Sequence, residues 1–339
     1  MSKLRLSFIT ANNERIQPLI DGEVEPEGIE LVVTHSDPSE TFWRQLRFQE
    51  FEFCEMSLSS YLIARARGID MIMLPVFPSR RFMHATHSVH ADSGIRPGHP
   101  EDLQGKRVGV GEYQQTASLW ARGVWEHDFG VSQFDVDWYM ERTEELSHGG
   151  ATGFQPMDGI KFHRIPRDKS LASMLVRHEI DAAPVQRAFS REKNIIDRST
   201  HIRAQEGDWS KVKPLFPDLI AEGTRFYQQH GFIPANHAYA IRGDIYREYP
   251  WTAFNLYAAF VRAKELYMRR FGSSVPSGLI FGSHYLRMTR DIFGDDPYPY
   301  GVNANRPMIE TIIAFSHEQG FIPEKPKVEE LFAESTLDL

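Results

Sequence analysis

Apolar positions along the chain follow two different periods in turn. Leu4, Leu6 and Phe8 recur at every second position, which indicates a strand over residues 4–10. Leu171 and Leu175 recur at helical spacing, which indicates an amphipathic helix over residues 170–178. Segments of the two kinds alternate through the chain, and this favours an α/β protein with a mainly parallel sheet and helices on its faces.

The same patterns predict the remaining elements. We expect a helix at 250–264, because proline is favoured at a helix start, and a helix at 116–128 that ends before Gly130. Residues 82–90 are expected to be extended, and residues 144–159 to form a polar, glycine-rich loop that is mobile enough to act as a lid. The other expected strands are 29–34, 53–57, 70–75, a segment within 103–111, one around Trp138 and Tyr139, 180–184 and 236–242, and the other expected helices are 41–49 and 59–67.

The chain has 339 residues, more than one hydrophobic core usually organises, so two lobes are expected. A segment rich in turn residues, 92–102, indicates the first passage from one lobe to the other. We therefore predict a discontinuous first lobe of residues 1–95 plus 240–339 and a second lobe of residues 96–239.

Composition and charge narrow the class of protein. The net charge of −8 argues against nucleic acid as the main partner, because phosphate binding needs a basic face. No run of 18 apolar residues and no apolar leader is present, so no membrane partner is expected and the protein is expected to be cytoplasmic. The single cysteine, Cys54, excludes an intramolecular disulfide, and its apolar surroundings predict a structural thiol rather than a nucleophile.

Several segments resemble known families. Residues 102–110 (DLQGKRVGV), residues 171–183 (LASMLVRHEIDAA), and Asn236–His237 followed by the helix at 250 occur in the order typical of type II periplasmic solute-binding proteins. Within that superfamily, residues 89–95 (VHADSGI) and 111–123 (GEYQQTASLWARG) are similar to the 4,5-dihydroxyphthalate decarboxylase family. The resemblance covers about residues 3–325.

The resemblance implies a fold and a reaction. It implies a two-lobed α/β fold of the type II periplasmic-binding-protein kind, with a ligand cleft between the lobes. It also implies a cofactor-independent carboxy-lyase that converts 4,5-dihydroxyphthalate to protocatechuate. Such a site needs an acid that protonates the ring carbon, a polar partner for the phenol and cations for the retained carboxylate.

A basic pair supplies the first candidates. Arg80 and Arg81 follow the expected strand at 70–75, and an arginine can clamp a carboxylate with two hydrogen bonds. On an extended segment the two point to opposite faces, so one of them is expected to reach the ligand unless both are solvated. The same extended segment would put His84 on the face of Arg80 and Phe82, as a candidate proton donor or a structural histidine.

The start of the helix at 116 supplies the next candidates. Its backbone N–H groups form an anion site, to which Thr116 can contribute. Glu112 either handles protons in the site or serves helix-end electrostatics. Trp120 and Trp125 in the same helix are expected in the core.

Further histidines complete the prediction. His237 lies where the chain is expected to return to the first lobe, and it is a third candidate catalytic residue beside His84 and Glu112, unless it is a structural histidine there. The predicted substrate-binding residues are Arg80, Arg81, Asn12, Arg15, Ser57, Tyr113, Thr116, His148, His163 and Asn236. No metal-ligand signature such as His-Glu-x-x-His is present, so neither a metal nor an organic cofactor is expected.

Two other functions fit the same fold. A binding protein or sensor for a small aromatic acid would need the ligand site but no acid–base residues. A pyrimidine synthase of the thiamine pathway is the third interpretation, and it is disfavoured because its cysteine-rich motif is absent. In each case a small molecule is the expected partner, and a homo-oligomer is expected only because most soluble oligomers are of that kind.

Overall fold

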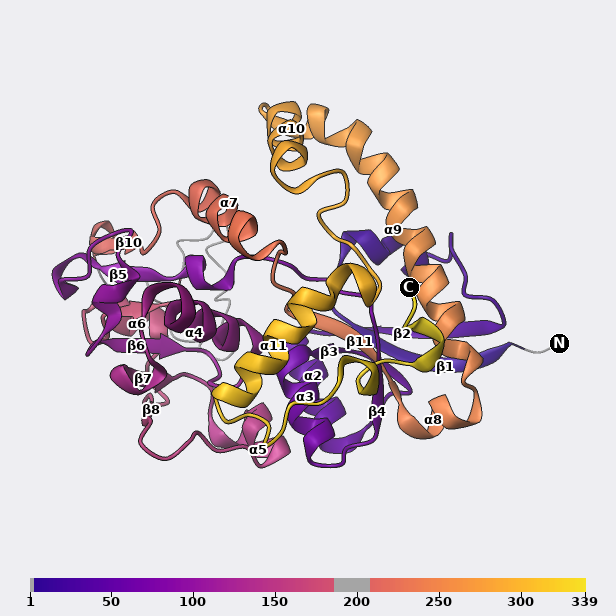
Figure 1. The fold of residues 1–339 in the computed structure, drawn as a ribbon, viewed down its shortest axis with the longest axis horizontal. Coiled ribbons are helices and arrows are strands. Elements are labelled where there is room, and N and C mark those ends of the chain that lie inside the picture. The colour runs from indigo at the N-terminus through magenta and orange to yellow at the C-terminus, as the bar shows by residue number, and fades with distance from the viewer. Residues whose placement is uncertain (1–2, 186–207) are drawn as a thin grey trace. The chain divides into compact units, whose positions relative to one another are not determined.

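The computed structural model describes residues 3–185 and 208–339 of the chain (Figure 1). These residues form two compact units, each with its own sheet. Unit 1 consists of Met1–Arg81, His230–Thr311 and Pro326–Leu339, and unit 2 of Phe82–Gln229 and Ile312–Lys325.

The passages between units lie at other positions than those proposed from the sequence, which were residues 95 and 240. The first passage falls after Arg81, because β5 (Ser88–His90) pairs with β9 (Ala182–Ala183) and β10 (Val212–Pro214) of the second sheet. A late segment also returns to unit 2, since α11 (Arg306–Glu318) begins in unit 1 and ends in unit 2.

The sheet of unit 1 has five strands in the order β2-β1-β3-β11-β4. The central strand β3 (Phe53–Ser57) is parallel to β1 (Leu4–Thr10) and antiparallel to β11 (His237–Arg242). The edges are β2 (Ile29–His35) and β4 (Met71–Leu74). All five residues of β3 are buried, as expected for a central strand covered on both faces.

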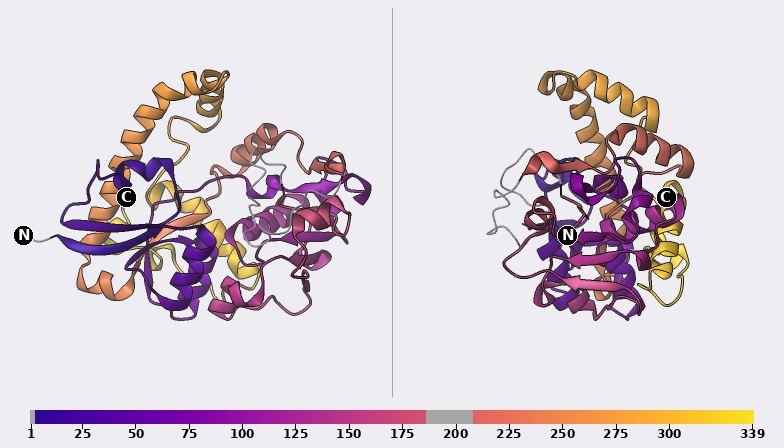
Figure 2. Two further views of the ribbon diagram at one scale, coloured as in Figure 1. Left: turned by 180° about the vertical axis from the view of Figure 1, so that it is seen from behind. Right: turned by 90° about the vertical axis from the view of Figure 1, so that its left-hand side faces the viewer.

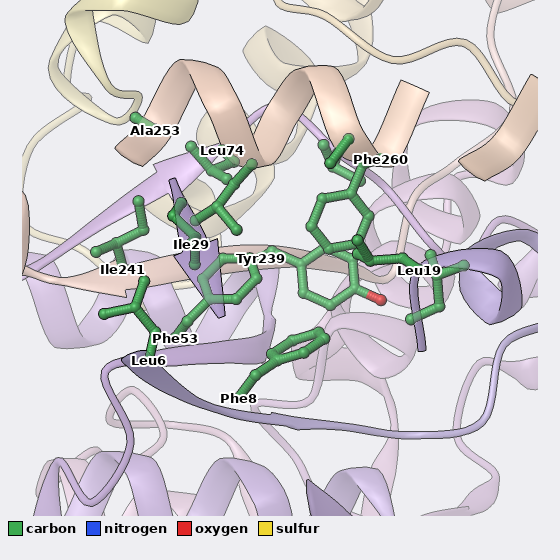
Figure 3. Packing of buried hydrophobic residues seen from close by; sticks show 14 of the residues in the cluster. Leu6, Phe8, Leu19, Ile29, Phe53, Leu74, Tyr239, Ile241, Ala253 and Phe260 are labelled. Atoms are coloured by element: carbon green, nitrogen blue, oxygen red, sulfur yellow. The ribbon is translucent and has the colours of Figure 1, made fainter. Parts of the chain in front are cut away.

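Aromatic side chains hold this sheet to α9 (Trp251–Gly278). The ring of Tyr239 stacks on Phe260 of α9 with 4.5 Å between centroids, and Phe8 stacks on Phe53 at 4.7 Å (Figure 3). Burial of such rings is the largest hydrophobic contribution a core residue makes. The other helices of unit 1 are α1 (Gln17–Ile20), α2 (Pro38–Phe48), α3 (Leu58–Ala66), α8 (Gly243–Glu248) and α10 (Gly282–Phe293).

In the described part of unit 2, the sheet has six strands in the order β10-β5-β9-β6-β7-β8. Its parallel part consists of β9, β6 (Arg107–Val110), β7 (Asp137–Met140) and β8 (Lys161–Arg164). The helices of this unit are α4 (Thr116–Phe129), α5 (His148–Thr152), α6 (Leu171–Val176) and α7 (Leu219–His230), and Figure 2 shows the unit from two further sides.

Most expected elements are present, and two expectations are wrong. Residues 82–90 are not extended throughout, because η2, a 3-10 helix at Met83–Thr86, turns the chain and buries His84. Residues 144–159 are not an irregular loop, since they contain η6 (Glu144–Leu146) and α5. Trp120 and Trp125 are buried as predicted. Within the part of the chain that the structure describes, no helix has both the length and the apolar composition needed to cross a bilayer.

Candidate functional site

Polar side chains gather at one edge of the unit 1 sheet. The parallel strands β1, β3 and β4 end at this edge, and the antiparallel strand β11 begins there. Ligands of open α/β sheets bind outside the carboxyl ends of the strands. This edge carries Thr10, Ser57 and His237, of which the last two lie directly opposite one another.

His237 and Glu55 form a hydrogen-bonded pair at this edge. The Nδ1 of His237 lies 2.6 Å from Oε1 of Glu55, so the imidazole donates its Nδ1–H to the carboxylate. Thr10 Oγ1 and the backbone N–H of Ala11 each donate to the other carboxylate oxygen, at 2.9 Å. The ring of Phe42 packs edge-on against the imidazole. The pair has the geometry of an oriented acid–base histidine.

The carboxylate of this pair stays charged. Burial alone would raise the pKa of Glu55, but the hydrogen bonds and positive charge of His237, with the donors Ala11 and Thr10, outweigh burial and hold the pKa below its usual range. The carboxylate therefore fixes the orientation of the ring and stabilises its charged form.

Asn236 lies against the second ring nitrogen. Its Nδ2 is 2.9 Å from Nε2 of His237, and its Oδ1 is buried without a hydrogen-bond partner among the described residues. A neutral imidazole accepts from the amide, whereas an imidazolium would donate to the amide oxygen after a flip of the side chain. The side chain of His237 keeps 11% of its surface exposed, so this is the histidine of the predicted set that is both oriented and open to a small molecule.

The two adjacent arginines have different environments. The guanidinium of Arg80 donates to the carbonyls of Ile233 and Pro299, at 2.8 and 2.9 Å, and to the side chain of Asn305. Burial lowers the pKa of Arg80 to about 10. Arg81 is exposed, and its guanidinium has no hydrogen bond or ion pair within residues 3–185 and 208–339.

The backbone places Arg81 opposite Pro234, three positions before His237. The N–H of Arg81 donates to Pro234 O at 3.1 Å, and the N–H of Asn236 donates to Ser79 O at 2.8 Å. Arg81 is thus a free cation on the segment that pairs with the residues preceding His237.

Other predicted residues of unit 1 lie at or near the same edge. Arg15 donates to the carbonyl of Pro78 and stacks over the ring of Tyr298, with 3.9 Å to its centroid. Asn12 is exposed, and Ser57 is buried with its hydroxyl 3.3 Å from that of Ser59. Asn12 can therefore contact a ligand, whereas Arg15 and Ser57 mainly stabilise the loops.

A second polar cluster lies at the carboxyl edge of the unit 2 sheet. Glu112 follows β6, and its carboxylate accepts from Arg142 Nη1 at 2.9 Å and from Ser147 Oγ at 2.5 Å. The backbone N–H of His148 adds a donor at 3.3 Å, and Nε2 of His148 lies 3.2 Å from Arg142. The number of donors to this one buried carboxylate indicates that Glu112 orders α5 and Arg142.

Glycine is required where α5 approaches this carboxylate. A Cβ on Gly149 would come within 2.6 Å of the side chain of Gln114, and a Cβ on Gly150 within 2.7 Å of the Glu144 carbonyl. The Ser147-His-Gly-Gly sequence is therefore a packing requirement of a short helix rather than the mark of a mobile loop.

The remaining predicted residues of unit 2 differ in accessibility. Tyr113 is buried, and its hydroxyl donates to Gln133 at 2.9 Å. Thr116 is also buried, at the first position of α4. His163 is exposed, with its ring 4.9 Å from that of Tyr139.

His84 lies in the core of unit 2. Its side chain is fully buried between Phe216 and Phe226, and its Nε2 lies 2.7 Å from Glu222 of α7. Burial lowers the pKa of His84, although Glu222 opposes this effect. These contacts favour a structural histidine over a proton donor, because the side chain of His84 links the 3-10 helix η2 to α7.

Two further observations concern metals and the thiol. No group of three or more His, Cys, Asp or Glu side chains suited to a metal ion occurs among the described residues. Cys54 is buried, and burial raises the pKa of its thiol far above the usual value, so the thiol is not a nucleophile at neutral pH.

Glu55 and Arg142 were not predicted from the sequence. Glu55 is a carboxylate in the fully buried strand β3, and a charge inside an apolar strand was the signal for a paired, functional group. Arg142 lies two residues after the end of β7, at the edge where ligands bind, but no local pattern distinguishes it from a solvated arginine.

Comparison with known proteins relates the chain to enzymes and to binding proteins. No protein-family model matches it. It is 33% identical over 341 residues to 4,5-dihydroxyphthalate decarboxylase of Comamonas testosteroni, covering 100% of this chain and 99% of the relative. It is 39% identical over 191 residues to 4,5-dihydroxyphthalate decarboxylase of Pseudomonas putida, covering 56% of this chain and 73% of the relative.

Two solved binding proteins have a similar fold. The periplasmic aliphatic sulphonate binding protein of Escherichia coli matches with a TM-score of 0.54 at 13% identity, over 99% of both chains. The alkanesulfonate-binding protein of Xanthomonas axonopodis pv. citri, bound to MOPS, matches with a TM-score of 0.54 at 12% identity, over 98% of both chains. At such low identity the likeness establishes the fold alone, and the predicted periplasmic-binding-protein-like fold is confirmed.

Proposed function

The chain belongs to the 4,5-dihydroxyphthalate decarboxylase family, and we propose that it is a carboxy-lyase that converts 4,5-dihydroxyphthalate to protocatechuate and carbon dioxide. The observation that carries this proposal is the match over the full length of a curated relative of that name. The Glu55–His237 pair supports it independently, because the reaction needs a positioned proton donor.

His237 acts as the acid in the proposed mechanism. Loss of carbon dioxide from an aromatic ring leaves an aryl carbanion unless the carbon that bears the carboxylate is protonated first. The imidazolium of His237 transfers a proton to that carbon, and electron density from the hydroxyl in the para position compensates for the lost aromaticity. The carbon–carbon bond to the carboxylate then breaks, its electron pair returns to the ring, and carbon dioxide leaves.

Asn236 and Glu55 assist His237 in this scheme. Glu55 stabilises the imidazolium and holds its orientation. The unpartnered amide oxygen of Asn236 is suited to accept a hydrogen bond from the imidazolium or from a phenol of the substrate. His237 recovers its proton from solvent, so each turnover consumes one substrate and one proton and no other reactant.

Arg81 is the proposed anchor of the retained carboxylate. It is the free cation of the arginine pair, whereas Arg80 binds backbone carbonyls. Replacing Arg81 by Ala should raise KM by about 10- to 100-fold and leave the free energy of unfolding unchanged, since a charge-assisted bond contributes about 1.5–3 kcal/mol.

Replacing Arg80 by Ala is the matched comparison. It leaves the acceptors at Ile233, Pro299 and Asn305 without their donor, so stability should fall by about 1–3 kcal/mol. Steady-state kinetics would measure KM, and urea unfolding would measure the free energy of unfolding, for both variants. A normal KM for the Arg81 variant would remove Arg81 from the site.

The proposed function is tested by incubating the purified protein with 4,5-dihydroxyphthalate, with and without a chelator, and measuring carbon dioxide and protocatechuate. Equal product in both arms is the expected result, because the proposed proton transfer uses side chains alone. Product lost on chelation would contradict cofactor-independent chemistry.

A melting-temperature measurement with the same compound discriminates the alternative function. The fold shared with sulphonate-binding proteins favours a binding protein or sensor as the second candidate function. A rise in melting temperature with 4,5-dihydroxyphthalate but no product would support that alternative and reject the enzyme.

A further inference from the structure

A helical arm in unit 1 lacks a hydrophobic core of its own. The arm, residues 265–296, contains the end of α9, the turn after it and α10 (Figures 1 and 2). Gly282 is its only buried residue among those whose exposure the structure describes. By contrast the first half of α9 is anchored in the core through Ala253, Leu256 and Phe260.

The tip of the arm exposes consecutive large apolar side chains. Leu279, Ile280 and Phe281 are 57%, 96% and 67% exposed, and Tyr285 on the first turn of α10 is 48% exposed. Helices gain most of their stability from packing one face, and exposed apolar patches mark interaction surfaces. The turn itself is tightly built, since a Cβ on Gly282 would come within 2.3 Å of the Val275 carbonyl. A closely packed helical turn with an apolar tip indicates a docking element.

The exposed residues on the outward face of α9 indicate which kind of surface would pack against this helix. Positions 251, 254, 258, 262, 265, 269 and 272 are spaced by three and four residues and therefore form one stripe. All of them are exposed except Ala258, which is half-buried. Near its middle the stripe carries Arg262 and Glu265, one turn apart and of opposite charge.

Because Arg262 and Glu265 carry opposite charges, two copies of this stripe that run antiparallel can pair each charge with its opposite. When two copies of α9 run antiparallel about a twofold axis between positions 262 and 265, Arg262 of each copy faces Glu265 of the other. The same register sets Phe254 of each copy within one position of Gly272 of the other, a large side chain against the smallest. An isologous interface requires this reciprocity.

Gly272 supports the same register independently. Glycine in a helix interior costs about 1 kcal/mol relative to alanine. A Cβ at Gly272 would meet nothing within 4 Å in the chain itself, so no intramolecular contact requires glycine there. Close approach of a second helix would require it.

We propose that α9 and the arm form a homodimer interface, in which two copies of α9 pack antiparallel through reciprocal Arg262–Glu265 contacts and the Leu279–Phe281 tips are covered by the other copy. The α9 helix of 28 residues is about 42 Å long at 1.5 Å per residue, which allows a continuous helix-pair interface. The proposal concerns assembly and is independent of the proposed reaction.

Charge exchange tests this interface. The mass of the wild type, Arg262→Glu, Glu265→Arg and the double variant would be measured by light scattering over a concentration series, with Lys161→Glu in unit 2 as a control of equal charge change. The wild type and the control should give twice the chain mass of 39.0 kDa. Each single reversal places like charges on the axis and should weaken association by at least about 100-fold, and the double variant should restore it.

Gly272→Leu separates assembly from folding. Leucine improves helix propensity and meets open space in the single chain, so the helix content should be unchanged while the dimer is lost. A monomeric wild type at all concentrations, or a double variant that stays dissociated, would overturn the proposal. If the wild-type protein bound anionic lipid vesicles and did not self-associate, the proposal would also be overturned, and a membrane surface would be the partner of the arm.

Discussion

At the residue scale, Glu55 should control the acid function of His237. Glu55→Gln keeps the shape and removes the charge that stabilises the imidazolium. We expect kcat to fall by about 100-fold, within the range of general acid catalysis, with KM little changed. Steady-state kinetics would measure both constants. Glu52→Gln is the matched control, since Glu52 is a carboxylate near the same strand that binds Ser7 instead, and an equal kcat in the two variants would refute the role of Glu55.

A second residue-scale prediction concerns pH and stability. Burial lowers the pKa of His87 to about 3, so the folded protein keeps this ring neutral while the unfolded chain takes up a proton below about pH 6.5. Stability is therefore lost as pH falls from about 6.5 towards 3, by about 1.4 kcal/mol per pH unit for the one proton. His87→Phe should remove that part of the slope in urea unfolding experiments, because phenylalanine cannot bind a proton. An unchanged slope in the His87→Phe variant would contradict the assignment.

Residue roles were predicted from the sequence only where a local pattern carries them. His237 and Asn236 were proposed because they lie where the chain was expected to return to the first lobe. Glu55 was missed, since its partner is 182 positions away along the chain and only the β3–β11 pairing brings the two together. The choice between Arg80 and Arg81 also depends on distant carbonyl acceptors, at Ile233 and Pro299.

At the element scale, close helix packing in unit 2 rests on one glycine. A Cβ on Gly123 of α4 would lie 2.1 Å from the ring of Phe315 in α11. Gly123→Ala should therefore destabilise the protein by about 1–3 kcal/mol, as overpacking does, in spite of the better helix propensity of alanine. Adding Phe315→Leu should recover part of the loss, and a double-mutant cycle in urea would measure the coupling. Additive losses would mean that the ring moves aside freely.

The elements themselves were largely predictable. The strand at residues 4–10 and the helix starting at 116 follow from period and capping signals, which are local. The turn at Met83–Thr86 was not predicted, because its cause is burial of His84 against α7, more than a hundred positions later. The arm was also missed, since its helical pattern has no core in the chain to pack against.

At the scale of the whole molecule, sequence motifs were sufficient to predict the fold. The proposed reaction can be tested by changing the substrate. In 4-hydroxyphthalate only one of the two carboxylates is para to the hydroxyl. If protonation is assisted from the para position, that carboxylate alone should leave, giving 3-hydroxybenzoate and no 4-hydroxybenzoate, and phthalate without a hydroxyl should be inert. In deuterium oxide the product should carry one deuterium, at the carbon para to the hydroxyl, because the acid exchanges its proton with solvent. Chromatography and mass spectrometry of the products would decide this. Formation of 4-hydroxybenzoate would show that the departing carboxylate is chosen by binding and not by the push of the para oxygen, and the mechanism through His237 would then need another source of stabilisation.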